Sequence, residues 1–213
     1  MSGITKMLIL SITFTLILVS IRIIYTKDVY YIFYVWNLFL AIIPFVCSCK
    51  IQKQTTIGIK TIVLLVLWLL FLPNAPYIIT DIFNYELREP IPMWYDLLIV
   101  TTAAWNGLLL GIVSLMQVEK FLLNHWKKIW VRSFVFISLM LCGYGVYIGR
   151  FSRFNSWDIV TKPQRIMIDS VHQVRHPFQN FQVWAFTGLF GAMLTIVYFT
   201  LQQLKTSNSS KLI

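Results

Sequence analysis

The sequence has 213 residues, of which 58% are hydrophobic and 12% are charged, and its formal net charge is +10. Soluble domains carry about 25% charged residues, so this composition excludes an ordinary water-soluble globular domain. The Lys and Arg residues lie mostly in the gaps between long apolar blocks, as membrane topology requires. This distribution excludes nucleic acid, the partner that such a positive charge would otherwise suggest.

Six apolar blocks are long enough for membrane-spanning helices, which need about 20 predominantly apolar residues. The blocks lie at about 7–25, 29–47, 57–72, 96–117, 129–149 and 181–201. We therefore predict an all-α fold, a polytopic membrane helix bundle of about six transmembrane helices. The length suits a single transmembrane domain over residues 1–213.

The distribution of Lys and Arg predicts the orientation, because cytoplasmic loops carry an excess of these residues. With a cytoplasmic N-terminus, the inner segments hold Lys6, Lys50, Lys53, Lys60, Lys120, Lys127, Lys128, Arg132, Lys205 and Lys211. The first two outer segments hold only Arg22, Lys27 and Arg88. We therefore predict that both termini are cytoplasmic. The last outer segment, residues 150–176, breaks the rule with five basic residues, and this makes it a candidate for function.

The glycines are concentrated in the last three predicted helices. Gly107 and Gly111 lie four residues apart in the fourth, Gly145 and Gly149 in the fifth, and Gly188 is in the sixth. Small residues at this spacing let helix backbones approach closely in lipid. We therefore predict that the last three helices form the tight core of the bundle and that the first three face more lipid.

A first motif follows the third predicted helix, at residues 72–81. Pro73 and Pro76 cannot both continue an unbroken helix, so the chain should kink or unwind at the membrane surface. Unwound backbone at that depth needs partners, which Asn74 and Asp81 can supply. Two interpretations stay open: a capped turn that leads into an interfacial helix, and a ligand site.

A second motif lies at the outer end of the fifth predicted helix. Arg150 and Arg153 are one turn apart if the helix continues, so both guanidinium groups can face one point. Paired guanidinium groups suit a carboxylate or a phosphate. The alternative is a structural ion-pair cluster with Asp81, Asp96 or Asp158.

Together the two motifs resemble a known bacterial family, Domain of Unknown Function 1361. The residues that carry the resemblance are Pro73–Tyr77 with Thr80 and Asp81, and the run Arg153–Asp158. The resemblance implies a multi-pass protein of a bacterial cell membrane with no assigned activity. In that family a histidine often follows the Thr-Asp pair by three residues, and here that position is Asn84, which removes a potential metal ligand.

A further helix is predicted at residues 162–176, at the membrane surface. Its apolar residues recur at helical spacing at Met167, Val171 and Val174. On the other side, His172 and His176 lie four apart and could bind a metal. The segment lacks the Glu of the helical zinc-protease motif, so a solvated polar face is the favoured interpretation. We predict no metal and no cofactor.

Three functions remain open. We favour binding or transport, in which an outward-facing polar site takes an anionic or zwitterionic group of a membrane lipid or envelope molecule. The alternatives are a membrane-embedded enzyme acting on such a substrate, and an accessory subunit that docks to another membrane protein. We predict that the two motifs meet at the outer surface. The candidate site consists of Asn74, Tyr77, Asp81, Arg150, Arg153, Asn155, Trp157 and Asp158.

Overall fold

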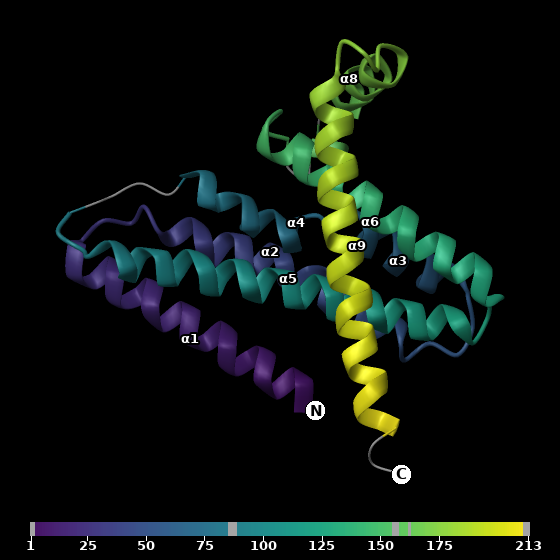
Figure 1. Ribbon diagram of the computed structural model, residues 1–213, viewed down its shortest axis with the longest axis horizontal. Coiled ribbons are helices and arrows are strands. Elements are labelled where there is room, and N and C mark those ends of the chain that lie inside the picture. The colour runs from purple at the N-terminus through teal and green to yellow at the C-terminus, as the bar shows by residue number, and fades with distance from the viewer. Residues whose placement is uncertain (1–2, 85–88, 155–157, 162, 211–213) are drawn as a thin grey trace. The chain divides into compact units, whose positions relative to one another are not determined.

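The computed structural model is built from helices (Figure 1). It describes residues 3–84, 89–154, 158–161 and 163–210, and these residues include no strand. The elements are α1 (Gly3–Thr26), α2 (Ile32–Ile51), α3 (Ile59–Phe71), α4 (Asn74–Tyr77), the 3-10 helix η1 (Ile78–Asn84), α5 (Met93–Leu123), α6 (Lys128–Arg150), α7 (Asp158–Thr161), α8 (Pro163–Arg175) and α9 (Phe181–Ser210).

Six of the described helices are long and apolar enough to cross a membrane. They are α1, α2, α3 with its continuation to Phe83, α5, α6 and α9. This confirms the predicted all-α membrane bundle with about six transmembrane helices. Several helices are longer than predicted, and α5, for example, exceeds the predicted 96–117 at both ends. Apolar length determines the span of a helix, whereas polar residues such as Glu119 can continue the same helix beyond the hydrocarbon layer.

The chain forms two compact units that divide within α5. Unit 1 is Met1–Gln117 and unit 2 is Val118–Ile213. The single domain over residues 1–213 stays a prediction.

The core of unit 1 is drawn from α1, α2, the α4–η1 segment and α5, and α2 also packs along α3 (Figure 1). α2 supplies the fully buried side chains of Tyr34 and Leu38, and α5 supplies Ile99 and Leu110. The prediction that the first three helices face more lipid than the last three is therefore wrong for α2, which is as buried as α6 and more buried than α9. Its apolar residues are large enough to fill the space between α1, α4 and α5, and packing of this kind needs no glycine.

Hydrogen bonds between distant helices hold unit 1 together in its interior. The Asn106 side-chain amide of α5 donates to Thr15 Oγ1 of α1 at 2.8 Å. The Trp68 indole N–H of α3 donates to Ser114 Oγ of α5 at 3.2 Å. Such bonds are favoured inside a membrane protein, where an unpaired polar group has no water to contact.

In unit 2, α6 packs antiparallel along α9 (Figure 1). A Cβ on Gly143 would lie 2.8 Å from the Thr187 carbonyl oxygen and 3.1 Å from the Gly191 nitrogen. The two backbones therefore meet at Gly143 and Gly191. A Cβ on Gly188, in contrast, would have nothing within 4 Å. The last two helices therefore do approach at glycines, but at Gly143 and Gly191. The prediction is wrong for Gly188, and for Gly145 and Gly149 it stays a prediction.

The start of unit 2 is tied to α9 by a carboxylate. Glu119, near the end of α5, accepts hydrogen bonds from the Tyr198 hydroxyl at 2.5 Å and from the Gln202 amide at 2.8 Å. The predicted helix at 162–176 is confirmed as α8, which lies at the end of α9 where that helix begins (Figure 1).

Candidate functional site

The first motif continues the helix instead of unwinding. The Leu72 N–H donates to the Trp68 carbonyl as in a regular helix, at 2.9 Å. The Ala75 N–H then bonds to the Leu72 carbonyl at 3.1 Å, three residues back, and a tighter 3-10 helix follows as η1. A shift from four-residue to three-residue bonding accommodates prolines without opening the backbone. The local structure is therefore a tight turn leading into a short helix, and the ligand site stays a prediction.

Asn74 compensates for the shifted hydrogen bonding. In an unbroken α-helix the Phe71 carbonyl would accept from the Ala75 N–H, which is directed instead to Leu72. The Asn74 side-chain amide donates to the Phe71 carbonyl at 3.0 Å. Asn74 thus satisfies a freed backbone group, as predicted, although that group is a carbonyl and not an amide. Its position next to Pro73 is therefore structurally explained.

The glycines of α5 provide the surface on which this turn lies. A Cβ on Gly107 would collide with the Ala75 carbonyl oxygen, and one on Gly111 would lie 3.1 Å from the Ala75 Cβ. Ala75 and Pro76 are buried as a result. The small-residue spacing of α5 therefore does bring backbones close together, but the partner of Gly107 and Gly111 is the proline motif. The predicted pairing among the last three helices is not what these contacts show.

Asp81 is buried at the end of the same segment. Its side chain belongs to η1, is 1% exposed, and accepts a hydrogen bond from the Asn37 amide of α2 at 2.9 Å. A buried carboxylate needs hydrogen-bond donors to offset its lost hydration. Thr80, beside it, is also buried and donates to the Tyr77 carbonyl at 2.6 Å. Asn74 and Tyr77 are half-buried, so these two candidate residues are accessible in unit 1.

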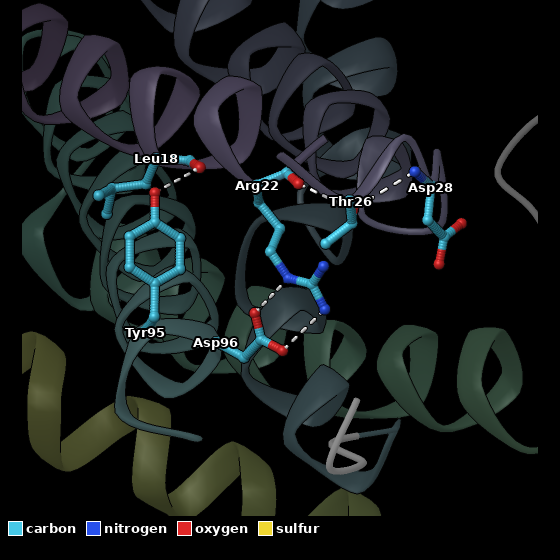
Figure 2. Close-up of polar contacts among 6 residues, drawn as sticks. All are labelled: Leu18, Arg22, Thr26, Asp28, Tyr95 and Asp96. Atoms are coloured by element: carbon cyan, nitrogen blue, oxygen red, sulfur yellow. Dashed lines mark hydrogen bonds and ion pairs between the residues drawn. The ribbon is translucent and has the colours of Figure 1, made fainter. Parts of the chain in front are cut away.

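A second buried polar contact of unit 1 lies where α1 ends and α5 begins. Figure 2 shows the Arg22 guanidinium directed at both oxygens of Asp96, with nitrogen–oxygen distances of 2.7 and 3.2 Å. Both side chains are 2% exposed. The Arg22 Cζ also lies 4.8 Å from the centre of the Tyr31 ring. This two-point geometry orients both partners and is the strongest form of ion pair available to a protein.

The surroundings of the pair fix the ends of both helices. The Tyr95 hydroxyl donates to the Leu18 carbonyl at 3.0 Å, which ties the start of α5 to α1 (Figure 2). The Thr26 hydroxyl donates to the Arg22 carbonyl at 2.8 Å and accepts from the Asp28 N–H at 3.3 Å. Asp96, named above as one candidate partner of Arg150 and Arg153, is therefore bound by Arg22 through both its oxygens.

The second motif belongs to unit 2, and its helix ends earlier than the spacing suggested. α6 ends at Arg150, which is half-buried, and Arg153 is exposed with a left-handed φ of 57°. The Phe154 N–H turns back to bond the Ile148 carbonyl at 3.2 Å. The helical continuation that would align Arg150 with Arg153 is therefore wrong. Arg153 stands in the reversal that follows the helix and not on its face.

The remaining candidate residues are only partly described. Asp158 begins α7, is 6% exposed, and accepts a hydrogen bond from the Thr161 hydroxyl at 3.2 Å. Asn155 and Trp157 lie outside the described residues. The candidate residues Asn74, Tyr77 and Asp81 belong to unit 1, while Arg150, Arg153 and Asp158 belong to unit 2. Their predicted meeting at the outer surface stays a prediction.

The two histidines of α8 are neighbours, as their spacing implies. The ring centres of His172 and His176 are 4.9 Å apart, and both side chains are exposed. Across the described part of the chain, no group of three His, Cys, Asp or Glu residues is arranged to hold a metal ion.

These elements define a multi-pass α-helical membrane protein whose proline motif, buried carboxylates and basic segment at residues 150–176 are its distinctive features. The chain belongs to the family described as protein of unknown function (DUF1361), which matches residues 36–197. The match covers both motifs and confirms the resemblance. No curated protein and no solved structure matches the chain. Arg22 precedes the matched region, so its ion pair joins α1 to the part shared with the family.

Reasoning from the sequence missed three residues of the buried polar contacts. Arg22 counted only as an outer cation, and Asn37 and Glu119 received no role. A signal was nevertheless present for Arg22 and Asn37, because each is a charged or amide side chain within a helix that is apolar enough to span the membrane. Such side chains are costly in lipid and usually face a partner within the bundle.

Proposed function

We propose that this membrane protein binds the anionic or zwitterionic group of a lipid or other envelope molecule at its outer surface. The observation that carries the proposal is Arg153. Its side chain is exposed, and its backbone has the left-handed conformation, which costs an L-residue about 1–2 kcal/mol. Strained residues of this kind concentrate at functional sites. An exposed guanidinium held in this way suits a phosphate or carboxylate.

The two motifs have different parts in this proposal. Arg150 and Arg153, both in unit 2, contact the anionic group. A contribution from Asn74 and Tyr77, which are half-buried in unit 1, stays a prediction from the sequence. Asp81 is too deeply buried to reach a ligand, so its part is to hold η1 in place through Asn37.

Replacing Arg153 tests the binding site directly. We expect Arg153→Gln to weaken the binding of short-chain phosphatidylglycerol by about tenfold, because a hydrogen bond to a charged group contributes about 1.5–3 kcal/mol. Native mass spectrometry of the purified full chain, titrated with phosphatidylglycerol and with phosphatidylcholine, measures the affinity and separates an anionic from a zwitterionic preference.

The matched control is Arg132→Gln, an exposed arginine near the start of α6, the helix whose end precedes Arg153. It should leave lipid affinity unchanged. Equal losses in the two variants would show that binding depends on charge in general, and an unchanged affinity in Arg153→Gln would overturn the proposal. A protein retained at fixed stoichiometry in place of lipid would favour the accessory-subunit alternative.

We also propose that the chain lies in a bacterial cell membrane with both termini in the cytoplasm. The bias of Lys and Arg supports this orientation. Cysteines introduced by Glu89→Cys and Gln164→Cys, both at exposed positions, should react with a membrane-impermeant maleimide on intact cells. Lys53→Cys, exposed in the first inner loop, should react only after permeabilisation. The reverse pattern would overturn the orientation, and the unaltered chain measures any reaction of the native cysteines.

A further inference from the structure

The helix α8 packs onto the rest of unit 2 through its polar side. Gln173 is its buried residue, and the Tyr144 hydroxyl of α6 donates to Gln173 Oε1 at 2.8 Å and lies 2.9 Å from Ser170 Oγ. The Trp184 indole N–H of α9 donates to the Gln173 carbonyl at 3.2 Å. The rings of Tyr144 and Trp184 stack, with their centres 6.2 Å apart. These contacts fix the rotation of α8 about its own axis.

That rotation leaves the apolar side of α8 exposed. The residues concerned and their exposed fractions are Met167 66%, Ile168 68%, Val171 45%, Val174 62% and, just beyond the helix, Phe178 95%. In a helix on a water-soluble protein the apolar stripe faces the core and polar residues face outward. Here the arrangement is reversed, so the apolar stripe requires an apolar surrounding other than the interior of unit 2.

The charge of this region identifies that surrounding. Residues 150–176 contain five Arg and Lys residues and two Asp residues. Within α8 itself, Arg175 is exposed beside the apolar stripe, and Arg165 is exposed on the polar side that carries His172 and His176. Asp169, the acidic residue of the helix, is half-buried. A helix with an apolar side flanked by basic residues is typical of one that lies in the interface of an anionic membrane.

The connections of α8 place it at a membrane surface. The preceding spanning helix α6 ends at Arg150, and the following one, α9, begins at Phe181. Both ends of the intervening segment are therefore held at the same side of the bilayer. A helix tethered in this way meets the interface at high effective concentration, so even a modest intrinsic affinity suffices for insertion.

We propose that α8 is an anionic-lipid anchor that lies in the membrane–water interface. Met167, Val171 and Val174 contact the acyl chains, and Arg165 and Arg175 contact anionic headgroups. The inference goes beyond the site proposed above and uses none of its residues. The apolar side of α8 contacts the lipid surface itself. The apolar face of such a helix is expected to be buried about 5–10 Å into the boundary between headgroups and acyl chains.

The test places an environment-sensitive NBD fluorophore on either side of α8. The full chain, with its three native cysteines replaced by alanine, carries Val174→Cys or, as the matched control, His172→Cys on the exposed polar side. Each labelled protein is reconstituted into vesicles of phosphatidylcholine with or without phosphatidylglycerol. At position 174 we expect blue-shifted emission, quenching by brominated lipid and protection from iodide. At position 172 we expect emission typical of water and quenching by iodide.

Lipid selectivity is read from the same fluorophore. Brominated phosphatidylglycerol should quench the label at position 174 more than brominated phosphatidylcholine at equal mole fraction. Replacing both arginines by glutamine, in Arg165→Gln with Arg175→Gln, should reduce this preference at least about fivefold. Two outcomes would overturn the proposal: quenching at position 174 by iodide, which would mean water, and protection from both quenchers, which would mean a covering protein surface. If the double variant kept the preference for phosphatidylglycerol, the two arginines would not bind anionic headgroups and that part of the proposal would be wrong.

Discussion

Asp96→Asn is expected to lower the midpoint of thermal unfolding of the detergent-solubilised protein by roughly 10 °C. Removing one partner of a buried ion pair leaves the other as an uncompensated buried charge, at a cost of about 3–5 kcal/mol. In a chain of this length, about 1 kcal/mol corresponds to a shift of about 2–4 °C. Because both Asp96 and Arg22 are 2% exposed, water cannot replace the lost carboxylate oxygen.

The geometry of the pair explains why so small a change should have a large effect. Asparagine has the size of aspartate, but it removes the negative charge and offers one acceptor in place of two. The Arg22 Nε and terminal nitrogen currently occupy both Asp96 oxygens at 2.7 and 3.2 Å. The face of Tyr31 at 4.8 Å gives the guanidinium some remaining stabilisation, so the folded state should persist at lower temperature.

Two controls distinguish the ion pair from a general effect of substitution. Lys27→Gln removes an exposed cation near the same end of α1 and should change stability by less than about 0.5 kcal/mol. The double variant Arg22→Met with Asp96→Leu should be more stable than Asp96→Asn alone, because it leaves no unpaired charge. If Asp96→Asn and Lys27→Gln had the same small effect, the pair would be accessible to water and the structural argument would be wrong.

The fold could be predicted because membrane helices leave a simple signal. Blocks of about 20 apolar residues determine where the chain spans the bilayer, and neighbouring contacts have little influence on this. The ends of α5 were predicted less well, since this helix continues through Glu119 and Lys120, whereas α6 ends at Arg150, within one residue of the predicted 149. The left-handed reversal at Arg153 was not predicted, because the sequence was read there as a helical continuation.

The buried polar contacts could not be predicted because they join residues far apart in the chain. Arg22 and Asp96 are separated by 74 positions, and Asn37 and Asp81 by 44. A single sequence shows that such side chains need partners in lipid, but it contains no measure of which partners they meet. The topology limits the possible partners of a polar side chain to residues at the same depth in the membrane. Which of these residues it contacts depends on how the helices pack.

The glycines of α5 show the same limit. Their spacing correctly predicts a close approach of two backbones, because a residue without Cβ leaves room for one. It cannot predict that the approaching backbone belongs to Ala75 in the proline motif, since a turn presents no repeating pattern. The sequence therefore indicated that the α5 glycines are contact positions, but it did not indicate that Ala75 is the residue they contact.

Gly107→Ala is expected to destabilise the protein by about 2 kcal/mol or more. The new Cβ would collide with the Ala75 carbonyl oxygen, which is backbone and cannot rotate away. Overpacking of this kind typically costs about 1–3 kcal/mol, and the usual gain from replacing a helical glycine by alanine, about 0.5–1 kcal/mol, is too small to offset it. Thermal unfolding of the detergent-solubilised protein measures the effect.

A graded series of glycine variants tests the cause of that loss. Gly111→Ala should cost less than Gly107→Ala, because its Cβ would lie 3.1 Å from a side-chain carbon that can shift slightly. Gly188→Ala should be neutral or stabilising by up to about 1 kcal/mol, since nothing lies within 4 Å of the new methyl group and alanine favours the helix. Equal losses at all three positions would mean that the α5 glycines do not seat the proline motif. A loss confined to Gly107 and Gly111 would link the stability of unit 1 to the turn that carries Asn74 and leads to Asp81.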